Sequence, residues 1–137
     1  MPIGILDLVA ADEENQPMTP VGFDRSAADA AFASLVRDVL NEFPRSMSES
    51  RRDAPFHGQI GVEVRPALAI VRASNFGRLI TIFPIVGLLP ADVIQRLKQL
   101  FKQHHYVFVE STVLQSVYGG VCHGDFKTWV DRFFGST

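Results

Sequence analysis

Cys122 and His123 form the pair of neighbours whose residue types could support covalent catalysis. They follow Gly119 and Gly120, and Asp125 comes shortly after them. A catalytic cysteine needs a base that forms the thiolate, and a glycine-rich turn could supply backbone N–H donors for an oxyanion. Side chains of adjacent residues rarely point at each other, however, so His123 is poorly placed to deprotonate Cys122. We therefore favour a turn with a thiol and a surface histidine, and keep a ligand-binding or catalytic site as the alternative.

The remaining histidines predict no metal site. His104 and His105 end a predicted helix, where histidine can cap the last carbonyl groups and is stabilised by the helix dipole. A zinc site uses three or four ligands at typical spacings, such as His-Glu-x-x-His or paired Cys-x-x-Cys motifs. The sequence contains neither spacing. We expect no metal and no cofactor.

Motifs of the commonest enzyme classes are missing. Ser111 lacks the Gly-x-Ser-x-Gly turn of a serine hydrolase, and the glycines at 58–61 and 119–120 match neither a Walker loop nor a dinucleotide fingerprint. Glu63 and Glu110 occupy positions at which a predicted strand would expose a polar residue to solvent. The sequence therefore favours a protein that is not an enzyme.

Charge is distributed unevenly along the chain. Residues 1–42 contain eight acidic residues and two arginines, whereas residues 43–137 contain eleven basic and seven acidic residues. The formal net charge is only −2, which argues against nucleic acid as a partner, since such proteins usually present a concentrated basic face. An acidic amino-terminal third could instead attract a basic protein, because complementary fields speed encounter.

Two groups of charged residues are candidates for contact with a partner. Asp12, Glu13 and Glu14 form the acidic group. Arg51 and Arg52 lie in a polar segment, and the planar guanidinium of arginine binds a carboxylate or phosphate through two hydrogen bonds. The alternative for this segment is a polar connection without a binding role.

Aromatic residues crowd the last third of the chain. Phe133 and Phe134 are neighbours that cannot both face one core comfortably, and Tyr118 and Trp129 lie nearby in the sequence. Most of the aromatic residues in this third are expected in the core, but these four could leave an exposed aromatic patch, and aromatic side chains are enriched among interface anchors. Self-association would explain such a patch equally well.

Apolar residues at helical spacing predict two amphipathic helices, over 26–43 and 90–104. Ser26 is the expected N-cap of the first helix, with Asp29 as its capping-box partner. A third, short helix is predicted from residue 125 onward, although its aromatic residues would also suit a closing strand.

Strands are predicted from alternating or short apolar runs at 3–9, 59–65, 68–73, 79–86 and 106–109. Residues 67–76 could instead form a short helix; we prefer a hairpin because Ile70 and Val71 favour strands. Residues 10–25 are expected to be an irregular connection and 45–58 a long polar loop, while 112–117 stays undecided. The predicted order is β-α-β-β-β-α-β-α. The fold class is therefore α+β, with an antiparallel or mixed sheet of about five strands and two to three helices packed on it.

Length and composition indicate one domain over residues 1–137. With 47% hydrophobic and 20% charged residues, the chain can build a core, and a single cysteine predicts no disulfide framework. The start has no basic region of a signal peptide, and the longest apolar stretch, 79–90, is too short to span a bilayer. We expect a cytoplasmic protein without a membrane partner.

The carboxy-terminal quarter carries a resemblance. Tyr106-Val107-Phe108-Val109 is followed by Leu114-x-x-x-Tyr118-x-Gly120 and by Thr128-Trp129-x-x-Arg132-Phe133-Phe134. This part resembles small uncharacterised bacterial α+β proteins, some of which look like immunity proteins that neutralise a toxin. The resemblance implies a non-catalytic protein that acts by tight binding.

The sequence thus predicts a protein-binding module, with an immunity-type antagonist of a bacterial toxin as one form of it. The alternative is a small-ligand-binding domain or enzyme with its site near Tyr118, Cys122 and His123. The candidate partner-binding residues are Asp12, Glu13, Glu14, Arg51, Arg52, Tyr118, Trp129 and Phe134.

Overall fold

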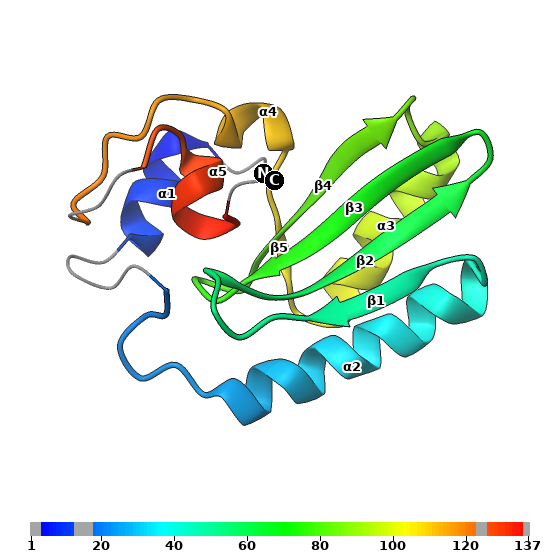
Figure 1. The fold of residues 1–137 in the computed structure, drawn as a ribbon, viewed down its shortest axis with the longest axis horizontal. Coiled ribbons are helices and arrows are strands. Elements are labelled where there is room, and N and C mark those ends of the chain that lie inside the picture. Colours follow the sequence, from blue (N-terminus) through cyan, green and yellow to red (C-terminus); the bar gives the residue numbers. More distant parts are fainter. Residues whose placement is uncertain (1–3, 13–17, 123–125, 136–137) are drawn as a thin grey trace.

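A five-stranded mixed sheet forms the centre of the molecule, in the order β1-β2-β3-β4-β5 (Figure 1). The computed structural model describes residues 4–12, 18–122 and 126–135. The strands are β1 (Met47–Ser50), β2 (Phe56–Val64), β3 (Ala67–Ser74), β4 (Leu79–Val86) and β5 (Val107–Phe108). The first four strands pair antiparallel, and β5 pairs parallel to β4. The α+β class and the hairpin of β3 with β4 are confirmed.

Two long helices cover one face of the sheet. They are α2 (Arg25–Glu42) and α3 (Ala91–Gln103), and Figure 1 shows α3 behind the sheet. Their apolar residues pack with the inward-facing residues of β2, β3 and β4 into the main core. Both helices were predicted, but the N-cap of α2 is Asp24 and not Ser26, because the Asp24 carboxylate accepts the Ala27 N–H at 3.0 Å.

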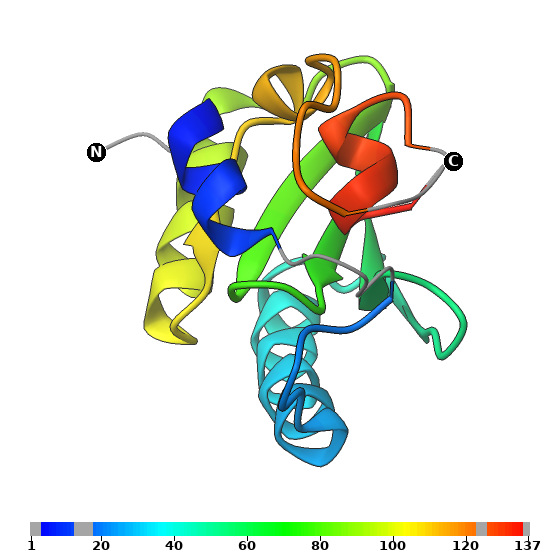
Figure 2. The ribbon, with the colours of Figure 1, turned by 90° about the vertical axis from the view of Figure 1, so that its left-hand side faces the viewer.

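Three short helices build a second core at one end of the sheet. They are α1 (Ile5–Ala11), α4 (Ser111–Leu114) and α5 (Trp129–Phe133). Figure 2 shows α5 on the side of the sheet away from α3. Leu79 and Phe83 of β4 belong to this second core, while the alternating residues Ile80 and Ile82 face the main core. We call this group the terminal cluster; its buried members are Leu8, Phe76, Leu79, Phe83, Val109, Leu114, Trp129, Phe133 and Phe134.

The prediction of a strand at residues 3–9 is wrong, because the described part of this segment begins α1. The Asp7 carboxylate accepts the Gly4 N–H at 2.9 Å, which caps the first turn of the helix. An apolar run this short does not show whether its residues repeat at helical or at strand spacing. In the structure, Leu8 of this helix is buried in the second core. The chain order is therefore α-α-β-β-β-β-α-β-α-α.

The prediction of one polar loop over 45–58 is also wrong, since the segment contains β1 and the start of β2. All four residues of β1 are exposed, so this edge strand lacks the alternation that marks a half-buried strand. It is recognised only by its pairing with β2, from Met47 opposite Gly61 to Ser50 opposite Gly58. The expected connection 10–25 is shorter, because α1 extends to Ala11 and α2 begins at Arg25.

The segments at 112–117 and 125–134 contain the two last helices. The undecided segment begins within α4, and Val117 then forms an isolated bridge with Thr128. The predicted carboxy-terminal helix is confirmed, but α5 begins only at Trp129, with Thr128 as N-cap. The Thr128 hydroxyl accepts the Asp131 N–H at 3.4 Å, and the Asp131 carboxylate accepts the Thr128 N–H at 3.2 Å.

A glycine in β2 lets α2 pack closely on the sheet. A Cβ atom at Gly58 would lie 2.3 to 2.7 Å from ring atoms of Phe32, a buried residue of α2. Three residues along the same strand, a Cβ at Gly61 would meet only the Met47 carbonyl oxygen, at 3.9 Å. The sheet therefore tolerates a side chain at one of these glycines but not at the other.

We expect Gly58→Ala to lower the free energy of unfolding by about 1–3 kcal/mol, because the methyl group forces Phe32 out of its packed position. Gly61→Ala is the matched control and should change stability by about 0.5 kcal/mol or less. Urea unfolding followed by circular dichroism measures both. Equal effects at the two positions would contradict the close contact between Phe32 and β2.

Candidate functional site

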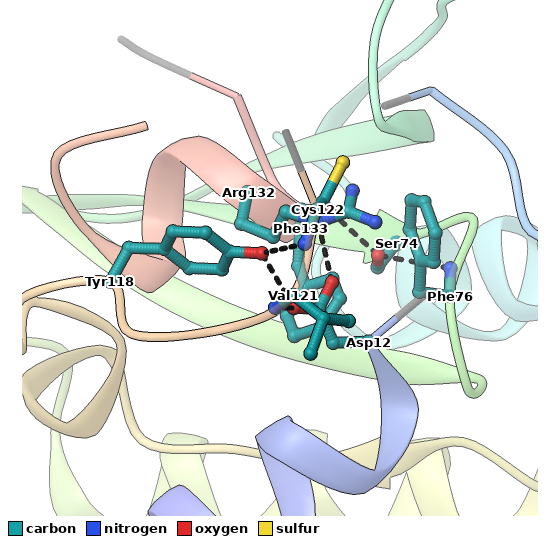
Figure 3. A network of polar contacts seen from close by, with 8 residues as sticks. All are labelled: Asp12, Ser74, Phe76, Tyr118, Val121, Cys122, Arg132 and Phe133. Atoms are coloured by element: carbon teal, nitrogen blue, oxygen red, sulfur yellow. Dashed lines mark hydrogen bonds and ion pairs between the residues drawn. The ribbon is translucent and has the colours of Figure 1, made fainter. Parts of the chain in front are cut away.

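A network of polar contacts joins the two ends of the chain inside the terminal cluster (Figure 3). Asp12 follows the last turn of α1, Tyr118 and Val121 lie in the loop after α4, and Arg132 belongs to α5. One oxygen of the Asp12 carboxylate accepts the Tyr118 hydroxyl at 2.5 Å and the Val121 N–H at 2.9 Å. The other oxygen accepts the Arg132 Nε–H at 2.7 Å. One carboxylate thus fixes a loop and a helix that are more than a hundred residues away in the sequence.

Both charged side chains of this network are fully buried. The side chains of Asp12 and Arg132 are each 0% exposed. The Arg132 guanidinium also lies over the Phe76 ring, at 4.3 Å from the centroid, and contacts the rings of Phe126 and Phe133. Burying an ion pair costs desolvation energy, which such hydrogen bonds and ring contacts offset. The arrangement is that of an internal ion pair and not of a charge presented to a substrate.

The ionisation of Asp12 and Tyr118 follows from these contacts. Burial alone would raise the pKa of Asp12, but the hydrogen bonds from Tyr118 and Arg132 outweigh it and hold the pKa below its ordinary value. Burial and the bond to Asp12 raise the pKa of Tyr118. Tyr118 therefore keeps its proton at neutral pH, and its hydroxyl donates a hydrogen bond to Asp12. A tyrosine in this state is a poor general base.

Gly120 is required by the same network. A Cβ atom at this position would lie 1.9 Å from the Asp12 carboxylate oxygen and 2.6 Å from the Tyr118 hydroxyl oxygen. At the neighbouring Gly119 nothing lies within 4 Å of such an atom. The glycine pair that could have supplied an oxyanion hole has a different use, because one glycine makes room for the buried carboxylate.

Cys122 lies at the edge of this network. Its side chain is buried, and its N–H donates to the Tyr118 hydroxyl at 2.9 Å. His123, the proposed base of the alternative site, and Asp125 lie outside the described residues. In the described part of this site, Tyr118 and the Cys122 backbone therefore serve to hold the loop in place.

The predicted exposed aromatic patch is wrong. Trp129, Phe133 and Phe134 are buried, and Tyr118 is half-buried with its ring 4.8 Å from that of Trp129. The two neighbouring phenylalanines face the same cluster because α5 ends at Phe133, so Phe134 leaves helical geometry. Phe133 contacts the Phe76 ring and Phe134 the Phe83 ring. Trp129 and Phe134 are thus removed from the surface where a partner would meet them.

The charged candidates within the described residues, Asp12, Arg51 and Arg52, do not form one surface. The Asp12 side chain is buried in the terminal cluster, contrary to its expected place in an exposed acidic group, and Glu13 and Glu14 lie outside the described residues. Arg51 and Arg52 are exposed just beyond the edge strand β1. Arg51 pairs with Glu49 at 2.9 Å, an exposed pair that contributes little to stability.

A second polar group lies beneath the start of α2, between His57 of β2 and Asn75 after β3. The Asn75 amide nitrogen donates to the Met18 carbonyl at 2.8 Å and to the Ala54 carbonyl at 3.0 Å. Its oxygen therefore faces His57 Nδ1, 3.0 Å away, so that Nδ1 must be the protonated nitrogen. Burial lowers the pKa of His57, although the bond to Asn75 partly opposes this effect. His57 is thus a buried neutral histidine.

The sequence did not reveal an apolar pocket between the outer part of β4 and α3. Its volume is about 220 Å³. The pocket exists because β5 stops after Phe108, whereas β4 continues to Val86, so the space beside the end of β4 is left without a strand. It is lined by Ala69, Ile82, Pro84, Leu88, Leu89, Ile94, Phe108, Glu110, Ser111 and Thr112.

One apolar side chain of this pocket is widely open to solvent. Leu88, in the loop between β4 and α3, lines the pocket and is 78% exposed. We call the pocket, with Leu88, the β4-end surface. A signal for it was present in the sequence, since two leucines stand in a loop between Gly87 and Pro90, where polar residues are usual.

By its fold and contacts, the chain is an α+β protein with a five-stranded mixed sheet and a buried ion pair that joins its two ends. No protein-family model matches it, and neither a curated protein nor a solved structure is significantly similar to it. Within the described ranges, no three or more His, Cys, Asp or Glu side chains come together as a metal site would require. In the same part of the chain, no helix has the length and apolar character needed to cross a membrane.

We expect Asp12→Ala to lower the free energy of unfolding by about 3–5 kcal/mol, because Arg132 would become a buried charge without its carboxylate. Asp92→Ala, at an exposed aspartate in the first turn of α3, is the control and should cost about 1 kcal/mol or less. Equilibrium urea unfolding compares them. A similar small loss in both variants would show that the buried pair does not hold the terminal cluster.

The buried neutral His57 should make the protein less stable in mild acid. Because its pKa is lower in the folded than in the unfolded state, the unfolded state binds the proton first. The stabilisation is complete above about pH 6.5, the unfolded value, and is lost as the pH falls below it. The slope that His57 contributes approaches about 1.4 kcal/mol per pH unit until the folded state is also protonated.

Thermal or urea unfolding at a series of pH values tests this expectation. His57→Gln should remove that part of the slope between pH 6.5 and 5, whereas the exposed His105→Asn should leave it unchanged. If His57→Gln kept the slope of the wild-type protein, protonation of His57 would not cause the acid sensitivity.

Proposed function

We propose that this chain is a non-catalytic protein-binding module that contacts its partner through the β4-end surface. The observation that carries the proposal is the apolar pocket of about 220 Å³ with the exposed Leu88 in its lining. An exposed apolar cluster with a polar rim is typical of a protein interaction site. Glu110, Ser111 and Thr112 supply the polar rim here.

The inward use of the polar residues supports the same proposal. The Asp12 carboxylate, the Tyr118 hydroxyl and the Arg132 guanidinium bond to one another inside the terminal cluster. Residues that serve as general acid or base must reach a substrate atom, and these three groups point into the protein. The alternative of a ligand site near Tyr118, Cys122 and His123 is the weaker proposal for this reason.

The resemblance in the carboxy-terminal quarter gives this binding a more specific form. An immunity-type antagonist would bind a bacterial toxin tightly in the cytoplasm and block it without catalysis. Such a role needs a preformed surface with apolar anchors, and the β4-end surface has these properties. The partner in this form of the proposal is the toxin itself.

We expect Leu88→Asp to abolish retention of the native partner, because the substitution places a charge at the centre of the apolar surface. Met47→Asp is the matched control, since Met47 is exposed to the same extent, 78%, but lies on the opposite edge of the sheet. Tagged proteins are used for affinity purification from the native host, and the retained proteins are identified by mass spectrometry.

The expected result is one stoichiometric partner with the wild-type protein and Met47→Asp, and none with Leu88→Asp. Thermal unfolding of the three proteins shows that each is folded. A partner retained equally by all three would refute the β4-end surface as the contact site. If no protein were retained by the wild-type chain, the binding role itself would be contradicted.

A further inference from the structure

The strand β5 pairs with only the first part of β4, so the rest of this edge of β4 has no neighbouring strand among the described residues. The backbone contacts show which groups of β4 point toward this edge. The Val107 N–H donates to the Arg78 carbonyl at 2.8 Å, and the Val109 N–H donates to the Ile80 carbonyl at 2.9 Å. Alternate residues of a strand direct their backbone groups to the same side. The backbone groups of Ile82 therefore point toward the same edge of β4, beyond the last strand pair of β5, Ile80 with Phe108.

The chain turns away before it covers Ile82. After Val109 it enters α4 at Ser111, and the Thr81 hydroxyl donates a hydrogen bond to the Val109 carbonyl at 2.6 Å. Two residues further along the edge, Pro84 has a carbonyl but no N–H. The edge of β4 thus offers one N–H and two carbonyl groups at Ile82 and Pro84, and both residues line the pocket.

The pocket lies where the side chains of a longer neighbouring strand would point. Ile82 and Ala69 direct their side chains to the main core, on the α3 side of the sheet, and α3 contributes Ile94 to the opposite wall. Ala69 is small, so the space beside it stays open. An extended segment along Ile82 would place one side chain of every two into this space.

The acidic residue Glu110 beside the pocket indicates the charge that a bound partner should carry. Glu110 is the charged residue of the lining, and its side chain is 56% exposed. It pairs with Lys98 at 3.4 Å. An exposed pair of this kind is weak, so exchange of Lys98 for a base of the partner costs little. The complementary partner is basic next to its apolar anchor.

We infer that the pocket binds an extended segment of a partner protein, which continues the line of β5 along β4. The segment inserts one bulky apolar side chain into the pocket and directs a lysine or arginine to Glu110. Strand addition of this type takes affinity from backbone hydrogen bonds and specificity from side-chain pockets. The inference rests on the proposed function and adds the chemistry of the partner to it.

Selection from a displayed library of random dodecapeptides, with the full chain as bait, tests this inference. The expected peptides carry a bulky apolar residue with a lysine or arginine close to it. Their affinity for the Leu88→Asp variant should be at least about tenfold lower than for the wild-type chain, because the bound peptide would no longer bury the Leu88 side chain. Glu110→Lys should weaken the same peptides about fivefold, whereas Glu49→Lys, at a residue of similar exposure on the opposite edge, should not.

Amide hydrogen exchange separates the inference from the function on which it rests. The Ile82 amide should exchange at least about tenfold more slowly when a selected peptide is bound. Peptides that need Leu88 but leave this amide unchanged would overturn strand addition, while the β4-end surface would stand as a binding site. A library without enriched peptides would overturn the inference. So would self-association of the wild-type chain that Leu88→Asp abolishes, because the occupant would then be a second copy.

Discussion

The buried ion pair between Asp12 and Arg132 is the interaction on which the arrangement of the terminal cluster depends. Both side chains are excluded from solvent, so neither can lose its partner without leaving a charge in an apolar surrounding. The Asp12 carboxylate also orders the loop at Tyr118 and Val121. One charge therefore determines the positions of α1, α5 and the loop between α4 and α5, none of which belongs to the sheet.

This use of polar residues leaves the outer surface with a different chemistry. Inside the terminal cluster, acid, base and hydroxyl groups satisfy one another, whereas the β4-end surface exposes Leu88 at an apolar pocket. The two edges of the sheet also differ. The edge strand β1 is short and carries Glu49, with Arg51 just beyond it, features that discourage further strand pairing. At the other edge, the protection by β5 ends after two residues.

Much of the fold could be predicted from the sequence where burial imposes a period. The helices α2 and α3 and the strands β2 to β4 have apolar faces that repeat at helical or strand spacing. The spacing of apolar residues did not predict α1, which is too short to show a repeat, or β1, which has no buried face. The candidate site was harder to predict. The burial of Phe134 depends on where α5 ends, and the role of Asp12 depends on Arg132, 120 residues away. Such contacts leave no local pattern.

The separation between Asp12 and Arg132 has a consequence for how the chain folds. The pairs of β1 with β2, β2 with β3 and β3 with β4 join neighbouring segments, so the first four strands form a meander of short-range contacts. The terminal cluster, in contrast, closes nearly the whole chain into one loop, and such closure carries the larger entropic cost. The meander should therefore assemble first, and α1 should dock last onto a sheet that is already formed. In the native protein, local opening should follow the reverse order and begin at α1.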